Sequence, residues 1–555
     1  MNKFTKFLSV AMSATMMFSA LAACNREPAA GGDVDNTKTQ LKVSNYEGGY
    51  GRAWLDNAIS RFEAKYANTS FEEGKTGVQV HVDSAKDGKA GETFLSSVAN
   101  TDFHVVVTED TFYYDAVTKN VALDITDVVT GTLSEFGENV SIESKMDSAL
   151  QSFYKTGAGK YYGLPHYEAF YGITYDKDLF NAKGFWIAED GTYTKPNKQG
   201  QFTVVLSAGP DGETGTSDDG LPATYDEFFA LCDEMVKQGV TPFTSSGLYI
   251  SMVTAMMYQI WADYEGKENF QKTVSFEGPM TVVDTLNDNG SFTTKTVDSF
   301  TKANAWEAYN QAGKVAALEF AKRMVSKASY YSSDMFSNAV DNIRAQANYL
   351  QSSLENKPVA FLVDGVWWEN EAEDAGTYGL QEGEYGESAS RHERKFGLLP
   401  MPKATEDKVG ENRTNALRLS SLVFVNRAAV ENNEVVKNLA KKFVQFIHTD
   451  NELQEFSVTT SALKPFNYTV PESKMANMSE FGKDLISTRS NPKYDTVYMV
   501  SNNDLFVQDV TKFDPAEAFR VTEGQDPIVL FKNNASWTVK TLFDKQETFR
   551  KNLWN

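Results

Sequence analysis

Aromatic and acidic side chains stand together at several points where a predicted strand ends. They are Tyr46 and Glu47 after the first strand, Glu109 and Asp110 after the third, and Trp367, Trp368 and Glu369 after the strand that begins at Val359. Carboxylates accept strong, charge-assisted hydrogen bonds from hydroxyl groups, and a large aromatic ring at a strand end either packs or stacks on something. These residue types suit binding of a polyhydroxylated ligand. Paired carboxylates beside tryptophans also serve glycoside hydrolysis.

A further pair of ionisable residues, His166 and Glu168, lies in the aromatic stretch 161–180. Gly163 and Pro165 stop any helix before the pair, and Phe170 to Tyr175 read as a strand after it. One interpretation is a solvent-exposed strand edge, since charged residues are mostly exposed. The other is a strand that crosses between two lobes and holds polar groups at the mouth of a cleft, where ligand sites tend to lie. The rest of the sequence favours the second.

The elements that must position these residues alternate between strands and helices. Strands are predicted at 41–46, 78–82 and 103–107, and helical spacing connects them, as in Trp54 to Phe62. Such alternation predicts an α/β fold with a mainly parallel sheet. In open α/β sheets the ligand lies beyond the carboxyl ends of the strands, which is where the acidic and aromatic residues fall.

Two later segments bear on the same cleft. Tyr249 to Trp261 is predicted as an apolar helix, usually core, whose end residue Tyr249 could reach the ligand. After the strand from Val359, the two tryptophans are read as extended chain. Adjacent side chains would then point opposite ways, so that one packs and the other faces the cleft. The charged segment Glu373 to Arg394 is predicted as a loop.

Bulk composition narrows the classes of protein. A chain of 555 residues is too long for one core, so at least two domains are expected. The formal charge of −22 disfavours binding to nucleic acid, because a negative surface repels phosphates. Two cysteines, Cys24 and Cys232, are too few for a disulfide framework, and Cys232 reads as a core thiol.

The first residues predict export. Lys3 and Lys6 precede an apolar run, Phe7 to Ala20, followed by Leu-Ala-Ala-Cys ending at Cys24. This ending resembles the bacterial lipobox, which implies a signal peptide at 1–23, cleavage before Cys24 and a lipid on its thiol. A plain secretory leader with an incidental cysteine is the alternative. Residues 24–40 are then the acylated cysteine and a flexible tether, and no later apolar run is long enough to span a membrane.

An acidic, glycine-rich segment, 185–222, interrupts the α/β pattern. Its carboxylates at Asp211, Glu213, Asp218 and Asp219 stand on a loop bent by glycines. Calcium takes six to eight hard oxygen ligands, so a structural calcium site is one prediction, although the spacing does not fit the EF-hand. A solvated acidic loop is the other.

Several motifs occur together in one order. They are the lipobox, the turn at 46–51, Tyr-Gly-Leu-Pro leading to Tyr-Asp-Lys-Asp-Leu-Phe at 162–180, Phe-Leu-Val-Asp-Gly-Val-Trp-Trp at 361–368, Phe-Gly-Leu-Leu-Pro-Met-Pro at 396–402, and Ala-Lys-Lys-Phe-Val-Gln-Phe-Ile at 440–447. In this order they resemble the solute-binding proteins of bacterial ABC transporters, in the sugar-binding branch that includes maltose-binding protein. The likeness spans residues 41–465; the acidic segment, the charged segment 373–394 and the long C-terminal extension depart from it.

The resemblance implies two α/β lobes, joined by hinge strands, that close on ligand like a clamshell. Crossings would fall at 166–172, 415–421 and 463–467. Lobe one would then comprise 41–167 with 422–463, and lobe two 168–421 with 464–555, including the insertion 185–222.

The resemblance also assigns roles. Tyr46 and Glu47 look like the first sugar-contacting loop, and Glu109 and Asp110 like the acidic contacts after the third strand. Glu168 looks like the hinge acid, and Trp367 like the stacking aromatic of lobe two. The further candidates are the neighbours Trp368 and Glu369, Tyr249 as a second stacker, and His166 from position alone.

The function that follows is binding, not catalysis. A lipid-anchored protein on the outer face of a bacterial membrane would capture a carbohydrate, most simply an oligosaccharide, and deliver it to an ABC permease, as a monomer and without a required cofactor. The alternatives are an exported glycoside hydrolase and a peptide-binding protein of the same architecture. Nucleophile-elbow, zinc-protease and Walker A motifs are absent from the sequence.

Overall fold

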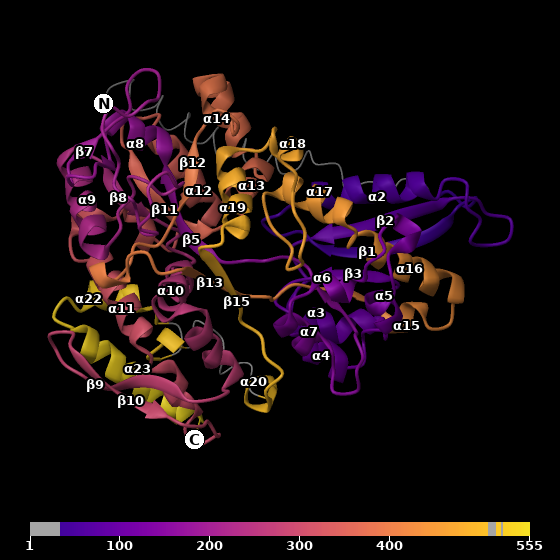
Figure 1. Cartoon of the computed structure of the whole chain (residues 1–555). Coiled ribbons are helices and arrows are strands. Elements are labelled where there is room, and N and C mark those ends of the chain that lie inside the picture. Colours follow the sequence, from indigo (N-terminus) through magenta and orange to yellow (C-terminus); the bar gives the residue numbers. More distant parts are fainter. Residues whose placement is uncertain (1–33, 509–517, 523–524, 555) are drawn as a thin grey trace, which may run out of the picture.

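Two separate β-sheets divide the chain into two lobes (Figure 1). This computed structural model describes residues 34–508, 518–522 and 525–554. The predicted signal peptide, Cys24 and the first part of the tether lie outside these residues. Within them, no helix is both long and apolar enough to cross a membrane.

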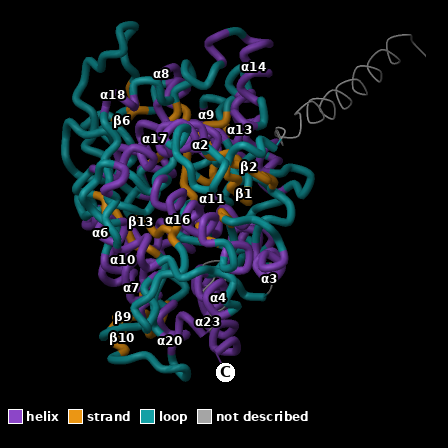
Figure 2. Tube along the Cα trace, turned by 90° about the vertical axis from the view of Figure 1, so that its right-hand side faces the viewer, coloured by secondary structure: helices purple, strands orange, loops and turns teal. Residues whose placement is uncertain are grey.

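Lobe one is built on a five-stranded sheet in the order β2-β1-β3-β14-β4. Its strands are β1 (Thr39–Tyr46), β2 (Val78–Ala85), β3 (Val105–Thr108), β4 (Leu164–Pro165) and β14 (Leu422–Val425). The helices and helical turns of this lobe are α2 (Ala53–Lys65), α3 (Gly91–Ser97), α4 (Tyr113–Thr118), α5 (Thr126–Thr130), α6 (Ile142–Lys145), α7 (Ser148–Tyr154), α15 (Arg427–Val430), α16 (Glu434–Phe446) and α17 (Asp450–Thr460). Helix α16 buries Val436, Leu439, Ala440 and Phe443, a 3–4 spacing that presents one apolar stripe to the sheet. The strands lie inside and the helices outside, as Figure 2 shows.

Lobe two is built on a four-stranded sheet in the order β12-β5-β11-β8. Its strands are β5 (Tyr171–Asp176), β8 (Thr241–Thr244), β11 (Val359–Gly365) and β12 (Phe396–Leu399). The helices around it are α8 (Lys177–Lys183), α9 (Tyr225–Lys237), α10 (Ser251–Ser275), α11 (Ala312–Met324), α12 (Asn342–Ser352), α13 (Trp368–Asp374), α14 (Thr377–Tyr385), α19 (Glu480–Ser490), α22 (Pro527–Asn533) and α23 (Val539–Trp554). All seven residues of β11 are buried, so this strand carries the core of the lobe.

Two chain segments pass between the lobes side by side, at residues 166–170 and 418–421, and residues 461–464 lie beside them. Backbone hydrogen bonds tie them together: the Glu168 amide donates to the Leu463 carbonyl at 2.8 Å, and Ala169 and Arg418 form an antiparallel bridge. A parallel pair, β13 (Arg413–Leu417) and β15 (Tyr494–Tyr498), flanks them. The two-lobed α/β architecture expected from the sequence is therefore the one observed.

The sheets are mixed, where the sequence predicted mainly parallel ones. Strands β1, β2 and β3 run parallel, but β14 is antiparallel to both β3 and β4, and β5 is antiparallel to β11 and β12. The reason is the hinge. Strands that adjoin a crossing enter their sheet from the other lobe and so run against the local βαβ direction.

Two further segments differ from expectation. The charged segment 373–394 was predicted as a loop, yet it holds the end of α13 and all of α14. The C-terminal part 464–555 was assigned wholly to lobe two, yet Asn467 hydrogen-bonds to Lys145 and Lys474 to Glu455, both of lobe one. Helix α20 (Asp504–Gln508) also packs on lobe one, through Phe506. The insertion 185–222 contains a small hairpin of β6 (Trp186–Ile187) and β7 (Tyr193–Thr194), and a second hairpin joins β9 (Met280–Leu286) to β10 (Phe292–Val297).

Candidate ligand-binding cleft

A cleft of about 450 Å³ lies between the lobes and is lined by both of them and by the crossing segments. Five of the predicted ligand contacts stand on its wall: Tyr46, Glu109, Asp110, Tyr249 and Trp367. They come from the ends of β1 and β3, from the start of α10 and from the end of β11. The cleft thus lies beyond the carboxyl ends of parallel strands, where ligands of open α/β sheets bind.

The wall of lobe one carries two neighbouring carboxylates. Burial and the adjacent Asp110 raise the pKa of Glu109 to about 7, although a hydrogen bond with Tyr46 and the charges of Arg418 and Lys86 oppose the shift. Asp110 has a positive φ of 49°, a left-handed conformation that is uncommon for non-glycine residues and frequent at functional sites. Its carboxylate lies 3.9 Å from Arg418 of the second crossing.

The wall of lobe two carries Trp367 at the start of α13. Tyr171 meets the indole edge-on, with ring centroids 5.1 Å apart. The chain bends into a helix here, so Trp368 turns away into the core against Phe396 and Tyr349. The prediction that one tryptophan faces the cleft while the other packs matches this arrangement. Trp368 itself does not line the cleft.

Glu369 is also a core residue and not part of the cleft wall. It is buried, accepts a hydrogen bond from the Ser479 hydroxyl and lies 3.2 Å from Arg391. Glu47, the remaining candidate of lobe one, is half-buried beyond the end of β1, and its side chain is not part of the cleft lining.

The acid that lobe two does present to the cleft is Glu371, which the sequence analysis missed. Its amide donates to the Trp367 carbonyl at 3.0 Å, one helical turn back. Residues four apart share a helix face, so reading 367–371 as helical would have placed Glu371 beside the indole. Oε2 of Glu371 accepts from Asn342 at 2.7 Å and from Gln346 at 2.9 Å. Oε1 lies 3.8 Å from Lys86 of the opposite lobe.

A second buried carboxyl stands behind Glu371. Asp364 ends the buried strand β11 and accepts hydrogen bonds from Gln346 at 3.1 Å and from the Gly365 amide at 2.7 Å. Burial and the neighbouring Glu371 raise the pKa of Asp364 to about 8. At neutral pH this residue therefore carries its proton.

The two lobes touch at one side of the cleft, around the turn after β1. The Asn370 side chain donates to the Gly49 carbonyl at 3.1 Å, and Tyr50 meets the Trp367 ring edge-on at 6.0 Å. A Cβ at Gly49 would lie 2.0 Å from the indole, so only glycine allows this approach. The structure is thus a closed or nearly closed arrangement of the lobes.

Comparison with known proteins fits this geometry. A family model described as "bacterial extracellular solute-binding protein" matches residues 66–481, more than half of the chain. The chain belongs to this family. Its members are binding proteins, not enzymes. No curated protein matches the sequence as a relative.

Solved structures of sugar-binding proteins share the fold of this solute-binding protein. A chitin oligosaccharide binding protein aligns with a TM-score of 0.53 at 14% identity, covering 93% of this chain and 99% of that one. RafE in complex with raffinose gives 0.53 at 11% identity, covering 93% and 100%. Maltose-bound MalE3 of T. maritima gives 0.52 at 13% identity, also covering 93% and 100%. Identities this low establish the fold alone.

His166, expected at the mouth of the cleft, is instead buried within lobe one. Its ring packs at a tilt against Trp54, with centroids 4.7 Å apart, and its Nδ1 lies 3.0 Å from the ammonium of Lys464. Burial, followed by the charge of Lys464, holds the pKa of His166 well below its ordinary value. A neutral imidazole can accept the lysine's hydrogen bond, which gives this residue a structural role in the solute-binding protein.

Glu168, expected as a ligand contact, braces the hinge. Its carboxylate accepts hydrogen bonds from the Arg489 guanidinium and, at 2.8 Å, from the Tyr498 hydroxyl. Arg489 also donates to the carbonyls of Lys464 at 3.0 Å and Phe466 at 2.7 Å. Burial lowers the pKa of Arg489, but the charge of Glu168 and nearby tyrosines outweighs it, so that the net shift is upward.

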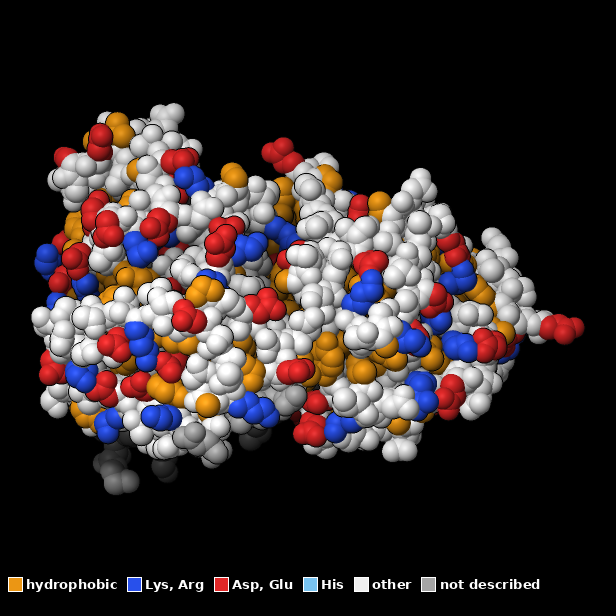
Figure 3. All heavy atoms as spheres, turned by 60° about the horizontal axis from the view of Figure 1, so that its bottom comes forward, with side chains coloured by type: hydrophobic (Ala, Val, Ile, Leu, Met, Phe, Trp, Pro, Cys, Tyr) orange, Lys and Arg blue, Asp and Glu red, His pale blue; other side chains and the backbone are white. Residues whose placement is uncertain are grey.

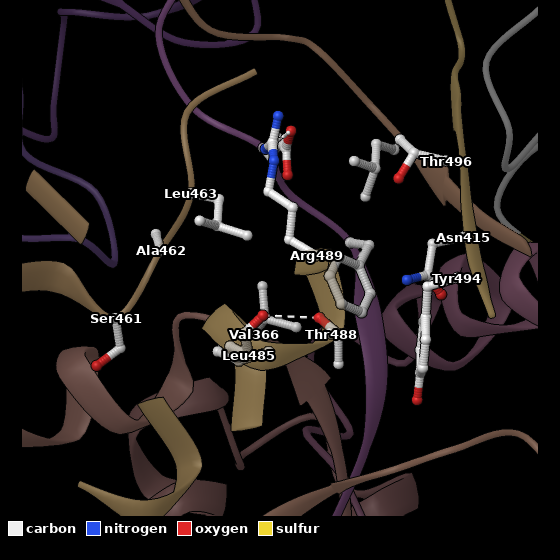
Figure 4. A pocket seen from close by; sticks show the side chains of 13 residues that line it. Val366, Asn415, Ser461, Ala462, Leu463, Leu485, Thr488, Arg489, Tyr494 and Thr496 are labelled. Atoms are coloured by element: carbon white, nitrogen blue, oxygen red, sulfur yellow. Dashed lines mark hydrogen bonds and ion pairs between the residues drawn. The ribbon is translucent and has the colours of Figure 1, made fainter. Parts of the chain in front are cut away.

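Glu168 and Arg489 border a small cavity behind the crossings, about 40 Å³ in volume (Figure 4). Arg489 extends between Leu463 on one side and Asn415 on the other. The pair β13–β15 forms a partition: Asn415 and Leu417 face this cavity, and Ala416 between them faces the ligand cleft. Glu168 is therefore on the far side of the partition from the ligand.

The acidic insertion loop uses its carboxylates internally. Asp218 is buried and pairs with Arg413, while Asp211 and Asp219 accept backbone amides of the loop and Glu213 lies 2.9 Å from Lys493. Among the described residues, no group of three or more acidic, histidine or cysteine side chains is placed to hold a metal ion. The calcium site stays a prediction.

Proposed function

We propose that this protein captures a neutral oligosaccharide outside the bacterial cell and delivers it to the permease of an ABC importer. The observation that carries the proposal is the composition of the cleft. One indole, Trp367, stands beside a carboxylate from each lobe, Glu109 and Glu371. A pyranose has an apolar face that an indole can cover and hydroxyls that carboxylates can bind.

The charges of the cleft favour an uncharged ligand. Its acidic residues Glu109, Asp110 and Glu371 are matched by Lys86, Arg418 and Arg520. Asp110 and Glu371 lie within 4 Å of Arg418 and Lys86 respectively. A charged ligand would have to displace these partners, whereas a neutral polyol can hydrogen-bond to them. The sugars named for the structural neighbours, raffinose and maltose among them, are uncharged, which supports the same class.

The partners follow from the family and from the N-terminal sequence. We propose that the mature protein begins at an acylated Cys24 and that the polar residues up to 40 tether it to the outer face of the cell membrane. We also propose that it acts as a monomer. On the face shown in Figure 3, acidic and basic side chains are interspersed and no basic patch gathers. Such a surface offers nothing to a nucleic acid.

A thermal-shift screen of the soluble protein beginning at Asn25 tests the function. The panel contains galactose, maltose, maltotriose, raffinose and chitin oligosaccharides. A sugar that binds only the folded state stabilises it by about 2.7 kcal/mol at a hundredfold excess over Kd. We expect one of the oligosaccharides to raise the melting temperature and to be recovered intact. Recovery of a cleaved sugar would instead indicate a glycoside hydrolase, and no shift with any sugar would reject the carbohydrate assignment.

A matched pair of variants tests whether the rise in melting temperature comes from sugar bound in the cleft. Trp367→Ala should lose the shift, while Trp186→Ala should keep it, because Trp186 lies in the insertion hairpin and contacts Asn181 and Phe202, away from the cleft. Loss of the shift in both variants would place the sugar elsewhere.

A further inference from the structure

The C-terminal extension passes from lobe two to lobe one beside the hinge segments. After β15 the Met499 amide donates to the Leu417 carbonyl at 2.9 Å, which ties the chain to the hinge strand β13. Three residues later the Asn502 side chain donates to the Ser152 hydroxyl at 2.9 Å. Ser152 lies on α7 of lobe one, so the chain has passed from the hinge to lobe one within a few residues (Figure 1).

An aromatic anchor holds this part of the extension on lobe one. Phe506 of α20 is 4% exposed, and its ring centroid lies 6.2 Å from that of Phe112 and 6.4 Å from that of Phe153. Phe112 precedes α4 and Phe153 belongs to α7, so both partners are part of lobe one. Leu505 and Val507 are partly buried beside them. The contact is apolar and adds to the Asn502 hydrogen bond.

The extension is anchored again in lobe two. Phe519 is fully buried, and its ring meets Tyr258 edge-on at 5.1 Å and Trp261 at 5.7 Å. Both partners belong to α10, the long helix of lobe two. The same extension supplies Met499 and Arg520 to the wall of the ligand cleft. Residues 499–507, which run from β13 to lobe one, are called the strap below.

We propose that the strap couples the two lobes and limits how far the cleft opens. The hinge segments lie side by side and allow rotation, but the strap is fixed to lobe one at Asn502 and Phe506 and, through Met499, to β13, which packs on α10 of lobe two. Opening the cleft must stretch the chain between Met499 and Phe506 or release Phe506 from lobe one, which exposes buried apolar surface. The Gly49 turn and α13 hold the lobes together by separate contacts, so the strap acts in addition to them. The strap's action does not depend on the identity of the solute.

Distance measurement between spin labels tests the strap without any ligand. The soluble protein beginning at Asn25 lacks Cys24, and Cys232 is buried, so labels attach only to introduced cysteines. Asp102→Cys in lobe one and Leu380→Cys in lobe two provide exposed positions, since the Asp102 side chain is 71% exposed and Leu380 is 77% exposed. Double electron–electron resonance then gives the distribution of inter-lobe distances.

Phe506→Ala releases the anchor on lobe one, and we expect the distance distribution to broaden and to shift away from that of the parent protein. Phe136→Ala is the matched control, because Phe136 packs on Phe446 at 5.7 Å within lobe one, and its distribution should remain that of the parent. Asn502→Ala, a milder change, should shift the distribution in the same direction as Phe506→Ala and serves if the latter does not fold. Folded strap variants with the parent distribution would overturn the proposal.

Discussion

The contacts of Glu168 with Arg489 and Tyr498 at the hinge offer the sharpest test of the site. The sequence predicts Glu168 as a ligand contact, whereas the structure gives it a structural role. Its carboxylate binds Arg489 and Tyr498 behind the β13–β15 partition. Replacing Glu168 by alanine leaves the guanidinium without its counter-charge and the Tyr498 hydroxyl without its acceptor.

The loss of stability in Glu168→Ala depends on the hydrogen-bond partners that Arg489 keeps. Removing one partner of a buried ion pair costs about 3–5 kcal/mol when the other is left uncompensated. Arg489 keeps two backbone carbonyl acceptors and its side chain is 22% exposed, which favours the lower end of that range. The free energy of unfolding should therefore fall by about 3 kcal/mol in Glu168→Ala. Glu168→Gln keeps an acceptor oxygen but loses the charge, and a loss of about 1 kcal/mol is expected because neutral hydrogen bonds are weaker.

Urea unfolding followed by tryptophan fluorescence measures these losses, with the sugar affinity determined on the same samples. The control is Glu431→Ala, which removes an exposed pair with Arg427 at 3.5 Å and should cost about 0.5 kcal/mol or less. Glu168→Gln should still bind sugar, since its side chain lies outside the cleft. Unchanged stability combined with lost binding in Glu168→Gln would refute the structural role and restore Glu168 as a ligand contact.

Further predictions concern the cleft and the insertion. Trp367→Ala should abolish sugar binding in calorimetry without changing the melting curve of the free protein; an unchanged affinity would remove Trp367 from the site. The pKa of Glu109, about 7 against an ordinary 4.5, predicts that sugar affinity falls below pH 7, because the protonated carboxyl accepts weaker hydrogen bonds from sugar hydroxyls than the carboxylate does, and that Glu109→Gln abolishes this dependence. For the free protein the sign is opposite: a raised folded-state pKa means that this group's contribution to stability is lost as the pH rises from about 4.5 to about 7. Gly49→Ala places a methyl group against Trp367 and should lower sugar affinity by separating the lobes, which a larger radius of gyration in small-angle scattering would show. If the insertion loop binds calcium, chelation should lower the melting temperature of the parent protein but not that of Asp211→Asn; equal melting curves with and without calcium would dismiss the site.

Much of the architecture could be predicted because local patterns carry it. The apolar spacing of Trp54 to Phe62 gave a helix that buries Trp54, Leu55, Ala58, Ile59 and Phe62, and Thr224 caps the helix that begins at Tyr225, as its residue type predicts. The predicted strand ends correctly placed Tyr46, Glu109 and Trp367 on the cleft, because the position of a strand's carboxyl end follows from the βαβ pattern.

The misplaced residues share a different cause. Whether His166 and Glu168 face a ligand depends on partners about three hundred residues away, Lys464 and Arg489, and no local pattern reports such contacts. Trp368 and Glu369 were placed on extended chain, and the change from strand to helix at Trp367 turned both into the core. The same change brought Glu371 to the cleft. Reading this segment as extended chain therefore explains the errors for Trp368, Glu369 and Glu371 together.

The strap could not be predicted for a related reason. The family model matches only as far as residue 481, and the sequence beyond it reads as ordinary apolar and polar helix. Phe506 alone carries no signal that its partners are Phe112 and Phe153, because an aromatic residue on a short helix usually packs on its own domain. Only the pairing of β13 with β15, which joins Asn415 to Thr496, brings the extension to the hinge and within reach of lobe one. In this protein the strap joins the two lobes in addition to the hinge strands. Contacts outside the hinge therefore also determine how readily the cleft opens.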